Sequence, residues 1–240
     1  MTVAAIIAAA GSGTRMGVDT PKQFLELMER PIVAWSLEAF SRAREVTEMI
    51  LVAHPAYMDL CSETAKRYSR GLAVKVVPGG HTRQESVLNG IKEVSPSIEW
   101  VAVHDAARPF ITPSQIDSTC LMAMEIGAAI AGAPIVDTVK EVEANIITRT
   151  LDRTHLVAAQ TPQVCRKDDL LRAYEQAAAQ GVTATDEAAL LELTGVTIGV
   201  NIVSGLNFKV TTKADLALAR AIAPVIAREG EHFLELDENG

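Results

Sequence analysis

Two glycines and two cationic side chains follow the first apolar run of the chain. Gly11 and Gly13 come directly after the run, and Arg15 and Lys22 lie shortly beyond them in "GSGTRMGVDTPKQF". Glycines let a polyanion approach backbone N–H groups, and nearby cations neutralise the charge that those groups leave uncompensated. The combination indicates a site for a phosphorylated ligand, although a tight strand-to-loop turn alone would also use the two glycines.

The spacing of these glycines disfavours the two commonest nucleotide-binding loops. A dinucleotide fingerprint needs Gly-x-Gly-x-x-Gly and an acid about twenty residues further on. Here the third glycine slot holds Met16, Gly17 comes one residue late, and the next apolar run ends at His54 without a carboxylate. Neither glycine is followed by the Gly-Lys pair of a P-loop. A dinucleotide oxidoreductase is therefore a weak alternative, which an absence of NAD binding would exclude.

Residues able to bind phosphate or hydroxyl groups follow several later apolar runs as well. In an open α/β sheet, binding sites lie beyond the carboxyl ends of the strands, so such residues can converge on one edge. Each cation taken alone is more commonly a solvated surface group, but together they indicate a site that carries several phosphate charges. They are Gly79, Gly80, Arg83 and Ser86 in "GGHTRQESV", Asp105, Ala106 and Arg108 in "HDAARPF", and Lys209 in "NFKVTTKADL".

Three residues of these motifs have a structural as well as a chemical interpretation. Asp105 follows an apolar run and could cap the next turn; alternatively it accepts a ligand hydroxyl or binds the Mg²⁺ that accompanies a triphosphate. His104 closes a buried run, so we expect a packed, hydrogen-bonded imidazole and assign it no chemistry. In "TATDEAALLEL" a threonine could cap a helix with acids in its first turn, and Thr185 could contact a ligand without altering that helix.

The elements that must position these residues alternate along the chain. Continuous apolar runs are typical of strands buried on both faces, and amphipathic stretches lie between most of them. This pattern predicts one α/β domain over residues 1–240, with a Rossmann-like, open and mostly parallel sheet and helices on both faces. The expected strands are 3–10, 49–53, 74–77, 100–103, 128–133 and 196–203, and the expected helices are 31–44, 55–70, 83–94, 113–126, 167–180 and 213–227.

One region interrupts the alternation. Residues 134–163 offer two β-branched segments around "EAN" with no helix between them, which predicts a β-hairpin of uncertain length. A hairpin that projects beyond the sheet cannot bury both of its faces by itself. It would pack on a second copy of the chain as a dimerisation arm at about 134–158, or fold back on its own domain.

Composition limits the class of protein. A formal net charge of −8 over 240 residues argues against a nucleic-acid-binding protein, which would carry a basic face. Cys61, Cys120 and Cys165 form no Cys-x-x-Cys pair and are expected to be reduced core thiols, and the histidines show no metal-ligand spacing. No run is as long as a membrane span and the N-terminus lacks a signal-peptide pattern, so we expect a cytoplasmic protein without a membrane partner.

Seven blocks that occur in order carry a family resemblance over nearly the whole chain. They are "AAAGSGTRMG…PKQF", "GGHTRQESV", "VHDAARPF", "DTVK", "LDRTHLVAAQTPQ", "TDEAALLE" and "FKVTTKADL". Together they closely resemble the 2-C-methyl-D-erythritol 4-phosphate cytidylyltransferases of the non-mevalonate isoprenoid pathway. The resemblance implies a Rossmann-like nucleotidyltransferase fold, a homodimer, and Mg²⁺-dependent transfer of CMP from CTP to methylerythritol phosphate. Because the chain ends soon after the last block, it resembles the single-function form without a fused cyclase domain.

The resemblance also implies roles for individual residues. Arg15 and Lys22 match the pair that stabilises the pentacoordinate α-phosphorus, while Arg153 and Lys209 would align the reacting phosphates. Thr138 and Arg153 lie on the arm and would enter the partner's active site, which favours the dimer. The family often has an acid where this chain has His81. The nucleotide-site positions are Ala9, Ala10, Gly11, Gly13, Gly80, Arg83, Ser86, Asp105 and Ala106, and the methylerythritol phosphate pocket has Asp105, Arg108, Thr138, Arg153, Thr161, Thr185 and Lys209.

Two other functions stay open on the sequence. Ribitol-5-phosphate cytidylyltransferases share the glycine loop, an "HDA-RPF" block and a "QTPQ" block, although "LDRTHLVAAQTPQ" and "DTVK" are closer to the methylerythritol phosphate branch. A regulatory or scaffold protein that binds nucleotide without turnover is the second alternative, which the full set of cations disfavours.

A phosphate nucleophile is mostly dianionic at neutral pH because its second pKa is about 6, so the absence of an obvious general base agrees with transfer chemistry.

Overall fold

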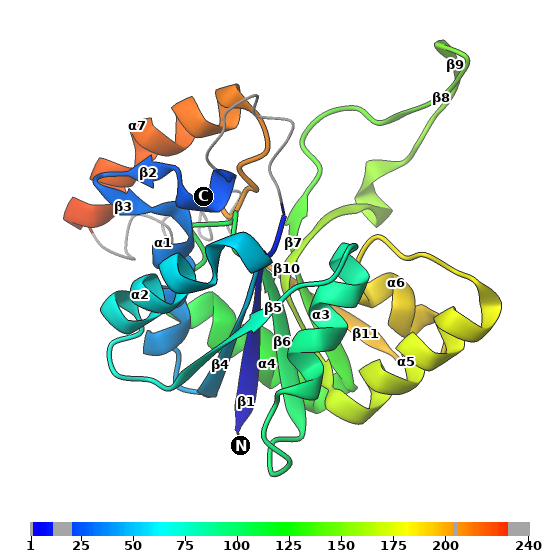
Figure 1. Cartoon of the computed structure of the whole chain (residues 1–240). Helices are drawn as coiled ribbons and strands as arrows, with labels where there is room; N and C mark the ends of the chain where they lie inside the picture. Colours follow the sequence, from blue (N-terminus) through cyan, green and yellow to red (C-terminus); the bar gives the residue numbers. More distant parts are fainter. Residues whose placement is uncertain (1, 12–20, 204–205, 230–240) are drawn as a thin grey trace.

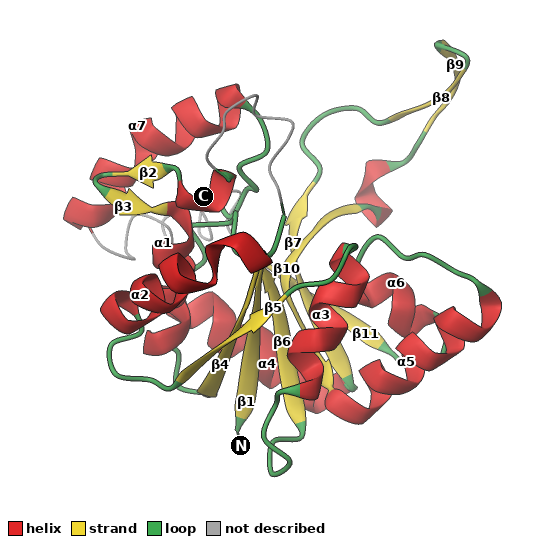
Figure 2. Ribbon diagram, in the orientation of Figure 1, coloured by secondary structure: helices red, strands yellow, loops and turns green. Residues whose placement is uncertain are grey.

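The computed structural model describes residues 2–11, 21–203 and 206–229. Its centre is a seven-stranded sheet in the order β11-β7-β10-β6-β1-β4-β5, in which neighbouring strands pair in parallel except at β10 (Figures 1 and 2). The strands are β1 (Val3–Ala9), β4 (Val46–Ala53), β5 (Val74–Pro78), β6 (Trp100–Asp105), β7 (Ala128–Pro134), β10 (Val157–Arg166) and β11 (Ile198–Ile202). The predicted Rossmann-like, mostly parallel sheet is confirmed.

Helices cover both faces of this sheet, as the continuous apolar runs require. Ala5 and Ile7 of β1 belong to one core, which also takes side chains from α1 (Ile32–Arg42), α2 (Met58–Tyr68) and α4 (Pro113–Ile126). The alternate residues Ala4 and Ile6 belong to a second core, with side chains from α3 (Arg83–Lys92), α5 (Lys167–Gln180) and α6 (Glu187–Glu192). Because successive side chains of a strand point to opposite faces, the two cores lie on opposite sides of the sheet.

A third, smaller core joins the beginning of the chain to its end. Helix α7 (Lys213–Glu229) packs on the short strand β2 (Glu26–Leu27), which pairs with β3 (Arg30–Pro31), and η2 (Lys22–Phe24) precedes both strands. Leu27, Val210 and Ala219 are fully buried in this core. Residues near position 22 and near position 209 are therefore held on the same side of the molecule.

Each of the six predicted strands and six predicted helices is present; helices 113–126 and 167–180 have the predicted ends, and the ends of the other elements differ. At helix 31–44, Pro31 is the residue before the first turn of α1 and not its first helical position. The amphipathic stretch 55–70 begins with a separate 3-10 turn, η3 (Pro55–Tyr57), before α2. The β2–β3 pair and the strand β10 were not predicted as separate elements.

The predicted hairpin around "EAN" is confirmed, and it takes up only the middle of residues 134–163. The hairpin consists only of β8 (Lys140–Glu143) and β9 (Ile146–Thr150), with left-handed turn residues Ala144 and Asn145 between them. After the 3-10 turn η4 (Arg153–His155), the chain returns to the main sheet as β10, antiparallel to both β6 and β7. Alternation of strands and helices cannot reveal such a strand, because no helix separates it from the arm.

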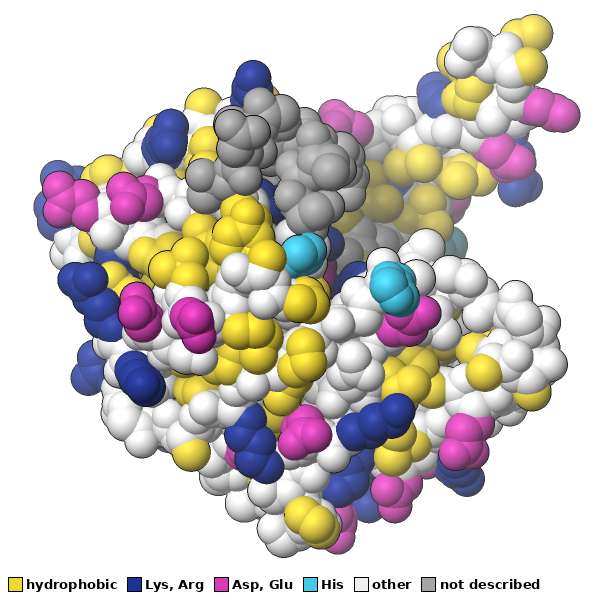
Figure 3. All heavy atoms as spheres, viewed as in Figure 1, with side chains coloured by type: hydrophobic (Ala, Val, Ile, Leu, Met, Phe, Trp, Pro, Cys, Tyr) yellow, Lys and Arg dark blue, Asp and Glu magenta, His cyan; other side chains and the backbone are white. Residues whose placement is uncertain are grey.

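The β8–β9 hairpin projects away from the sheet (Figure 1), and apolar side chains lie on its surface (Figure 3). Val136 is 81% exposed and Ile146 is 70% exposed, and Val142 and Ile147 are also exposed. Val157, at the start of β10, is less exposed but still outside the core. This chain alone therefore leaves a row of large apolar side chains in water.

The cysteines lie in the interior, as predicted. Cys61, Cys120 and Cys165 are buried and unpaired. Burial raises the pKa of Cys61 to about 11 and that of Cys120 to about 12, so both thiols stay protonated and unreactive at neutral pH. Within the described ranges, no helix combines the length and apolar character needed to cross a membrane.

Candidate active site

A pocket of about 840 Å³ opens at the carboxyl edge of the sheet. The ends of β1, β4, β5 and β6 and the segment before α7 line it, and a hollow with histidine side chains at its rim is visible in the space-filling view (Figure 3). Its size suits a small-molecule ligand. Most of the residues predicted for the site surround this one pocket: Ala9, Ala10, Gly11, Lys22, Gly79, Gly80, Arg83, Asp105, Ala106 and Lys209.

The glycine side of the pocket is built by close backbone approach. Gly79 donates its N–H to the carbonyl of Ala53 at 2.8 Å, which ties the end of β5 to the end of β4. A Cβ atom on Gly79 would lie 2.4 Å from Ala10 Cβ, so this position has no room for a side chain. Gly80 donates its N–H to Ser86 Oγ at 3.0 Å, which connects the loop to the first turn of α3.

Lys22 enters the pocket from η2. Its ammonium donates to the carbonyl of Val210 at 3.2 Å, so η2 contacts the segment before α7 directly. The neighbouring Gln23 is buried and donates its side-chain N–H to the carbonyl of Ala9 at 2.7 Å. Gly13 and Arg15, the other predicted residues of this loop, lie outside the described residues.

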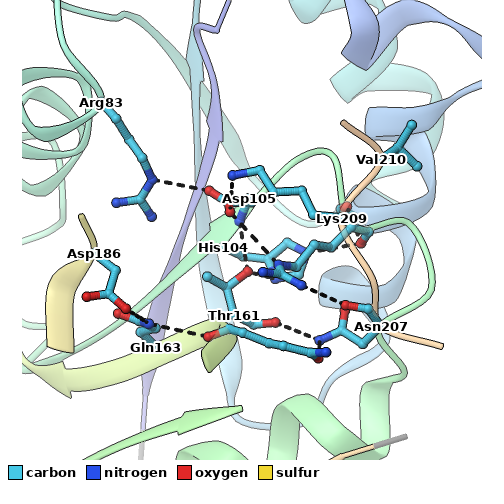
Figure 4. A network of polar contacts seen from close by, with 12 residues as sticks. Arg83, His104, Asp105, Thr161, Gln163, Asp186, Asn207, Lys209 and Val210 are labelled. Atoms are coloured by element: carbon cyan, nitrogen blue, oxygen red, sulfur yellow. Dashed lines mark hydrogen bonds and ion pairs between the residues drawn. The ribbon is translucent and has the colours of Figure 1, made fainter. Parts of the chain in front are cut away.

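Asp105 is surrounded by three cationic side chains (Figure 4). Its Oδ1 accepts from Arg83 Nε at 3.2 Å, its Oδ2 accepts from Lys209 Nζ at 2.7 Å, and Arg108 Nε lies 3.9 Å from Oδ2. Burial would raise the pKa of this carboxyl, but the charges of Arg83, Lys209 and Arg108 outweigh burial and lower it well below its usual range. Asp105 is therefore ionised and held in one place.

A second layer of polar side chains supports Asp105 from beneath. Thr161 Oγ1 accepts from the N–H of Asp105 at 3.1 Å and lies 3.1 Å from His104 Nδ1, while Nε2 of His104 lies 3.2 Å from the carbonyl of Arg108. Arg108 donates to the carbonyl of Asn207 at 2.8 Å. Burial lowers the pKa of His104 to about 4, so the ring is neutral at pH 7. The expectation of a packed, hydrogen-bonded histidine is confirmed.

The remaining predicted residues lie outside the pocket lining. Ser86, Arg108 and Thr161 are placed behind it by the bonds described above. Thr185 is exposed just before α6, and Asp186, not a threonine, caps that helix by accepting from the N–H of Ala189. Thr138 and Arg153 are exposed at the base of the arm, where Arg153 donates to the carbonyl of Val136. Within this chain, the arm residues do not join the pocket.

Several residues of the site escaped the sequence analysis. Glu187 is a buried carboxylate bound to Arg83, and Asn207 donates to Gln160 Oε1 at 2.8 Å and to the carbonyl of Thr161 at 2.9 Å. His54 lines the pocket. Glu187 stands inside the quoted block "TDEAALLE", but its sequence context there resembles an ordinary acid in the first turn of a helix.

The fold and the pocket define the class of this protein. A mostly parallel sheet with glycine loops and several cations at its carboxyl edge is typical of α/β proteins that bind nucleotides, here with a Rossmann-like nucleotidyltransferase fold. A model of the 2-C-methyl-D-erythritol 4-phosphate cytidylyltransferase family matches residues 3–224. The chain belongs to this family.

Individual relatives agree with that membership. The chain is 41% identical to a 2-C-methyl-D-erythritol 4-phosphate cytidylyltransferase of Solibacter usitatus, with 91% of this chain and 94% of the relative covered. It is 39% identical to the one from Pelotomaculum thermopropionicum, with 95% and 96% covered. Its fold is similar to the crystal structure of 4-diphosphocytidyl-2C-methyl-D-erythritol synthase from Anaerococcus prevotii, with a TM-score of 0.83, 30% identity, and 93% and 96% of the two chains covered.

Proposed function

We propose that this protein transfers CMP from CTP to 2-C-methyl-D-erythritol 4-phosphate and releases pyrophosphate. The observation that carries the proposal is the pocket, in which Lys22 and Lys209 lie together with the glycine loops that follow β1 and β5. Two ammonium groups beside glycine loops, whose backbone a ligand can approach closely, suit a ligand with several phosphate charges. The family and the names of its members support this choice of substrates.

The chemistry requires charge stabilisation and alignment. An oxygen of the substrate phosphate attacks the α-phosphorus of CTP, a new P–O bond forms, and the bond to pyrophosphate breaks. The attacking phosphate is mostly dianionic at neutral pH, so no proton has to be removed and neutral His104 takes no part. We assign Lys22, together with Arg15, to the charge that develops at the α-phosphorus, and Lys209, with Arg153, to alignment of the two anions.

Asp105 suits recognition of hydroxyl groups. An ionised carboxylate has about four lone-pair directions, and the two bonds from Arg83 and Lys209 leave others to accept from a ligand hydroxyl. We therefore assign it to hydroxyls of the ribose or of the polyol, with Arg108, Thr161 and Thr185 forming the polyol phosphate pocket. The backbone groups assigned to cytosine and ribose are those of Ala9, Ala10, Gly11, Gly13, Gly80, Ser86 and Ala106.

A Mg²⁺ ion is proposed to enter with the nucleotide. Among the described residues, no group of three or more His, Cys, Asp or Glu side chains could hold a metal ion. Both oxygens of Asp105 already accept from cationic side chains, so this donor set does not fit a metal held by the chain itself. Mg²⁺ commonly binds through substrate phosphates with few protein ligands. EDTA should leave the melting temperature unchanged and stop turnover, which excess Mg²⁺ restores; a lower melting temperature would indicate a protein-held metal.

We also propose a homodimer in which the arm of one chain reaches the pocket of its partner. The support is the row of exposed apolar side chains on the arm, among them Val136 and Ile146, which a second copy would remove from water. Thr138 and Arg153 lie at the base of that arm, away from the pocket of their own chain. The partner arrangement would bring Arg153 to the phosphates of the neighbouring site.

The deciding experiment measures pyrophosphate release with CTP and Mg²⁺, comparing methylerythritol phosphate with ribitol 5-phosphate. Release with the first substrate only is expected. Release with the second only would overturn the choice of polyol and leave the roles of Lys22 and Lys209 in place. Binding of CTP without release for either polyol would instead favour a regulatory nucleotide-binding protein.

A further inference from the structure

Glu187 places a carboxylate in the interior directly behind the pocket. The residue is 1% exposed, in the first turn of α6, and is absent from the pocket lining. Its two oxygens accept from Arg83 Nη1 at 2.8 Å and from Nη2 at 2.9 Å. This two-pronged contact joins α6 to the first residue of α3, 104 positions earlier in the chain.

The same guanidinium reaches a second carboxylate. Nε of Arg83 donates to Asp105 Oδ1 at 3.2 Å, so Arg83 bridges Glu187 and Asp105; the bond to Asp105 is drawn in Figure 4. Because a guanidinium is planar and its N–H directions are fixed, a carboxylate on the Nη1–Nη2 edge determines where Nε–H points. Glu187 thus sets the direction of the hydrogen bond from Arg83 to Asp105, although Glu187 takes no part in that bond.

Stability alone gives little reason for a carboxylate at this position. Glu187 stands beside Leu190 and Leu191, which pack in the second core, and a buried ion pair is often no more stabilising than apolar side chains of similar volume. A free arginine beside the glycine loop would, in contrast, be a natural two-pronged ligand for phosphate. The pair with Glu187 engages one N–H of each Nη atom of Arg83, the two-pronged edge that would otherwise face a phosphate.

We propose that Glu187 is a positioning residue for the transfer reaction: it directs Arg83 toward Asp105 and keeps this guanidinium off the triphosphate. The inference rests on the proposed function, which supplies the triphosphate and the role of Asp105. It also revises the expectation that Arg83 binds the nucleotide. In this arrangement Arg83 acts on the ligand through Asp105 and not by direct contact.

The test compares Glu187→Gln, Arg83→Gln and the double variant with wild type. Glu192→Gln is the matched control, because Glu192 is exposed on the same helix. The affinity for CTP with Mg²⁺ is measured by calorimetry without polyol phosphate, and kcat and KM are measured by pyrophosphate release. Melting temperatures report whether each variant folds. The double variant replaces the charged pair by a neutral pair, so it keeps the test possible if Glu187→Gln alone fails to fold.

We expect Glu187→Gln to lower kcat by about tenfold while CTP binds at least as tightly as in wild type, since Arg83 is released toward the phosphates. If Glu187 had only a structural role, Glu187→Gln would bind CTP more weakly and melt at a lower temperature, while kcat per folded molecule would stay unchanged. If Glu187 acts through Arg83, the double variant should have the kcat of Arg83→Gln within about twofold. If the fold-losses in kcat of the two single variants multiply in the double variant, the proposal is overturned.

The outcome can be separated from failure of the proposed function. Wild-type turnover tests the function by itself. If wild type turns over methylerythritol phosphate and Glu187→Gln behaves like Glu192→Gln, the positioning role is wrong and the function stands. If wild type binds CTP without turnover, tighter CTP binding by Glu187→Gln would still support the restraint on Arg83, and weaker binding would refute it.

Discussion

The ammonium of Lys22 donates to the carbonyl of Val210, 3.2 Å away and 188 positions later in the chain. This contact joins η2 to the segment before α7 at the edge of the pocket. The third core, in which Leu27 packs with Val210 and Ala219, holds the two segments together beneath the contact. The position of Lys22, the cation assigned to the α-phosphorus, therefore depends on the docking of α7, which is remote from Lys22 in sequence.

Replacing Lys22 tests its role at the α-phosphorus. Lys22→Ala should lower kcat by about 10²–10³-fold, the size expected when one preorganised charge donor is lost. The melting temperature should change little, because buried Gln23 and Phe24, the next two residues of η2, hold this turn in place without Lys22. Lys66→Ala, at an exposed position of α2, is the control for a lost surface charge. Unchanged turnover in Lys22→Ala would refute the assignment.

Asp105→Asn removes the shared counter-ion of Arg83, Lys209 and Arg108. Breaking a buried ion pair leaves an uncompensated charge. Because the cations are partly exposed, we expect the free energy of unfolding to fall by about 3 kcal/mol. For a chain of this size we expect the melting temperature to fall by roughly 6–12 °C. Pyrophosphate should then raise it more in the variant than in wild type, since the anion replaces the missing charge. Asp59→Asn, at an exposed position of α2, is the control. Equal melting temperatures for Asp105→Asn and wild type would contradict the role of Asp105 as the shared counter-ion.

His104 should make stability depend on pH in a defined window. Burial lowers the pKa of His104 to about 4 in the folded chain, against about 6.5 when unfolded. Between these values the unfolded state binds more protons than the folded state. The contribution of His104 to the free energy of unfolding, roughly 3 kcal/mol, is therefore fully present above pH 6.5 and is lost as pH falls toward 4. Urea unfolding of wild type and His104→Gln at pH 7, 5.5 and 4.5 isolates the effect. If the free energy of unfolding changes with pH in the same way in the two proteins, His104 is not responsible for the pH dependence.

Gly79→Ala should damage the nucleotide end of the pocket. The added Cβ would lie 2.4 Å from Ala10 Cβ and 2.9 Å from Ser86 Oγ, so the loop must move away from β1. We expect KM for CTP to rise by about tenfold or more, with a smaller change in kcat, because the backbone groups proposed to hold the nucleotide shift. Steady-state kinetics with varied CTP give the answer. A wild-type KM would show that the nucleotide does not depend on this close approach.

Mixing two inactive variants tests the shared site. In a heterodimer of Lys22→Ala and Arg153→Ala chains, one pocket carries both defects and the other carries neither. Random exchange of subunits should therefore restore about one quarter of wild-type turnover from two inactive parents. Each parent alone is the control, and sedimentation measures the oligomeric state. No recovery in a mixture that does form heterodimers would place Arg153 outside the partner's pocket.

The sequence by itself determined the elements that depend on local pattern. Continuous apolar runs and amphipathic stretches were enough for the strands and helices of the mostly parallel sheet, because periodicity follows directly from which faces are buried. The glycine loops and the polar and charged residues after separate strands were enough to locate the pocket at the carboxyl edge. Lys22, Asp105 and Lys209 were all found in this way and all line the pocket.

Only the tertiary structure decided which distant residues pair. The insertion of β10 between β6 and β7 in the antiparallel direction leaves no local signal, since strand direction depends on the path of the chain between strands. Likewise Glu187 resembles an ordinary helix-start acid until the fold places it 2.8 Å from Arg83. Side chains 104 positions apart meet only because two helices cover the same face of one sheet, and local periodicity carries no information about that meeting.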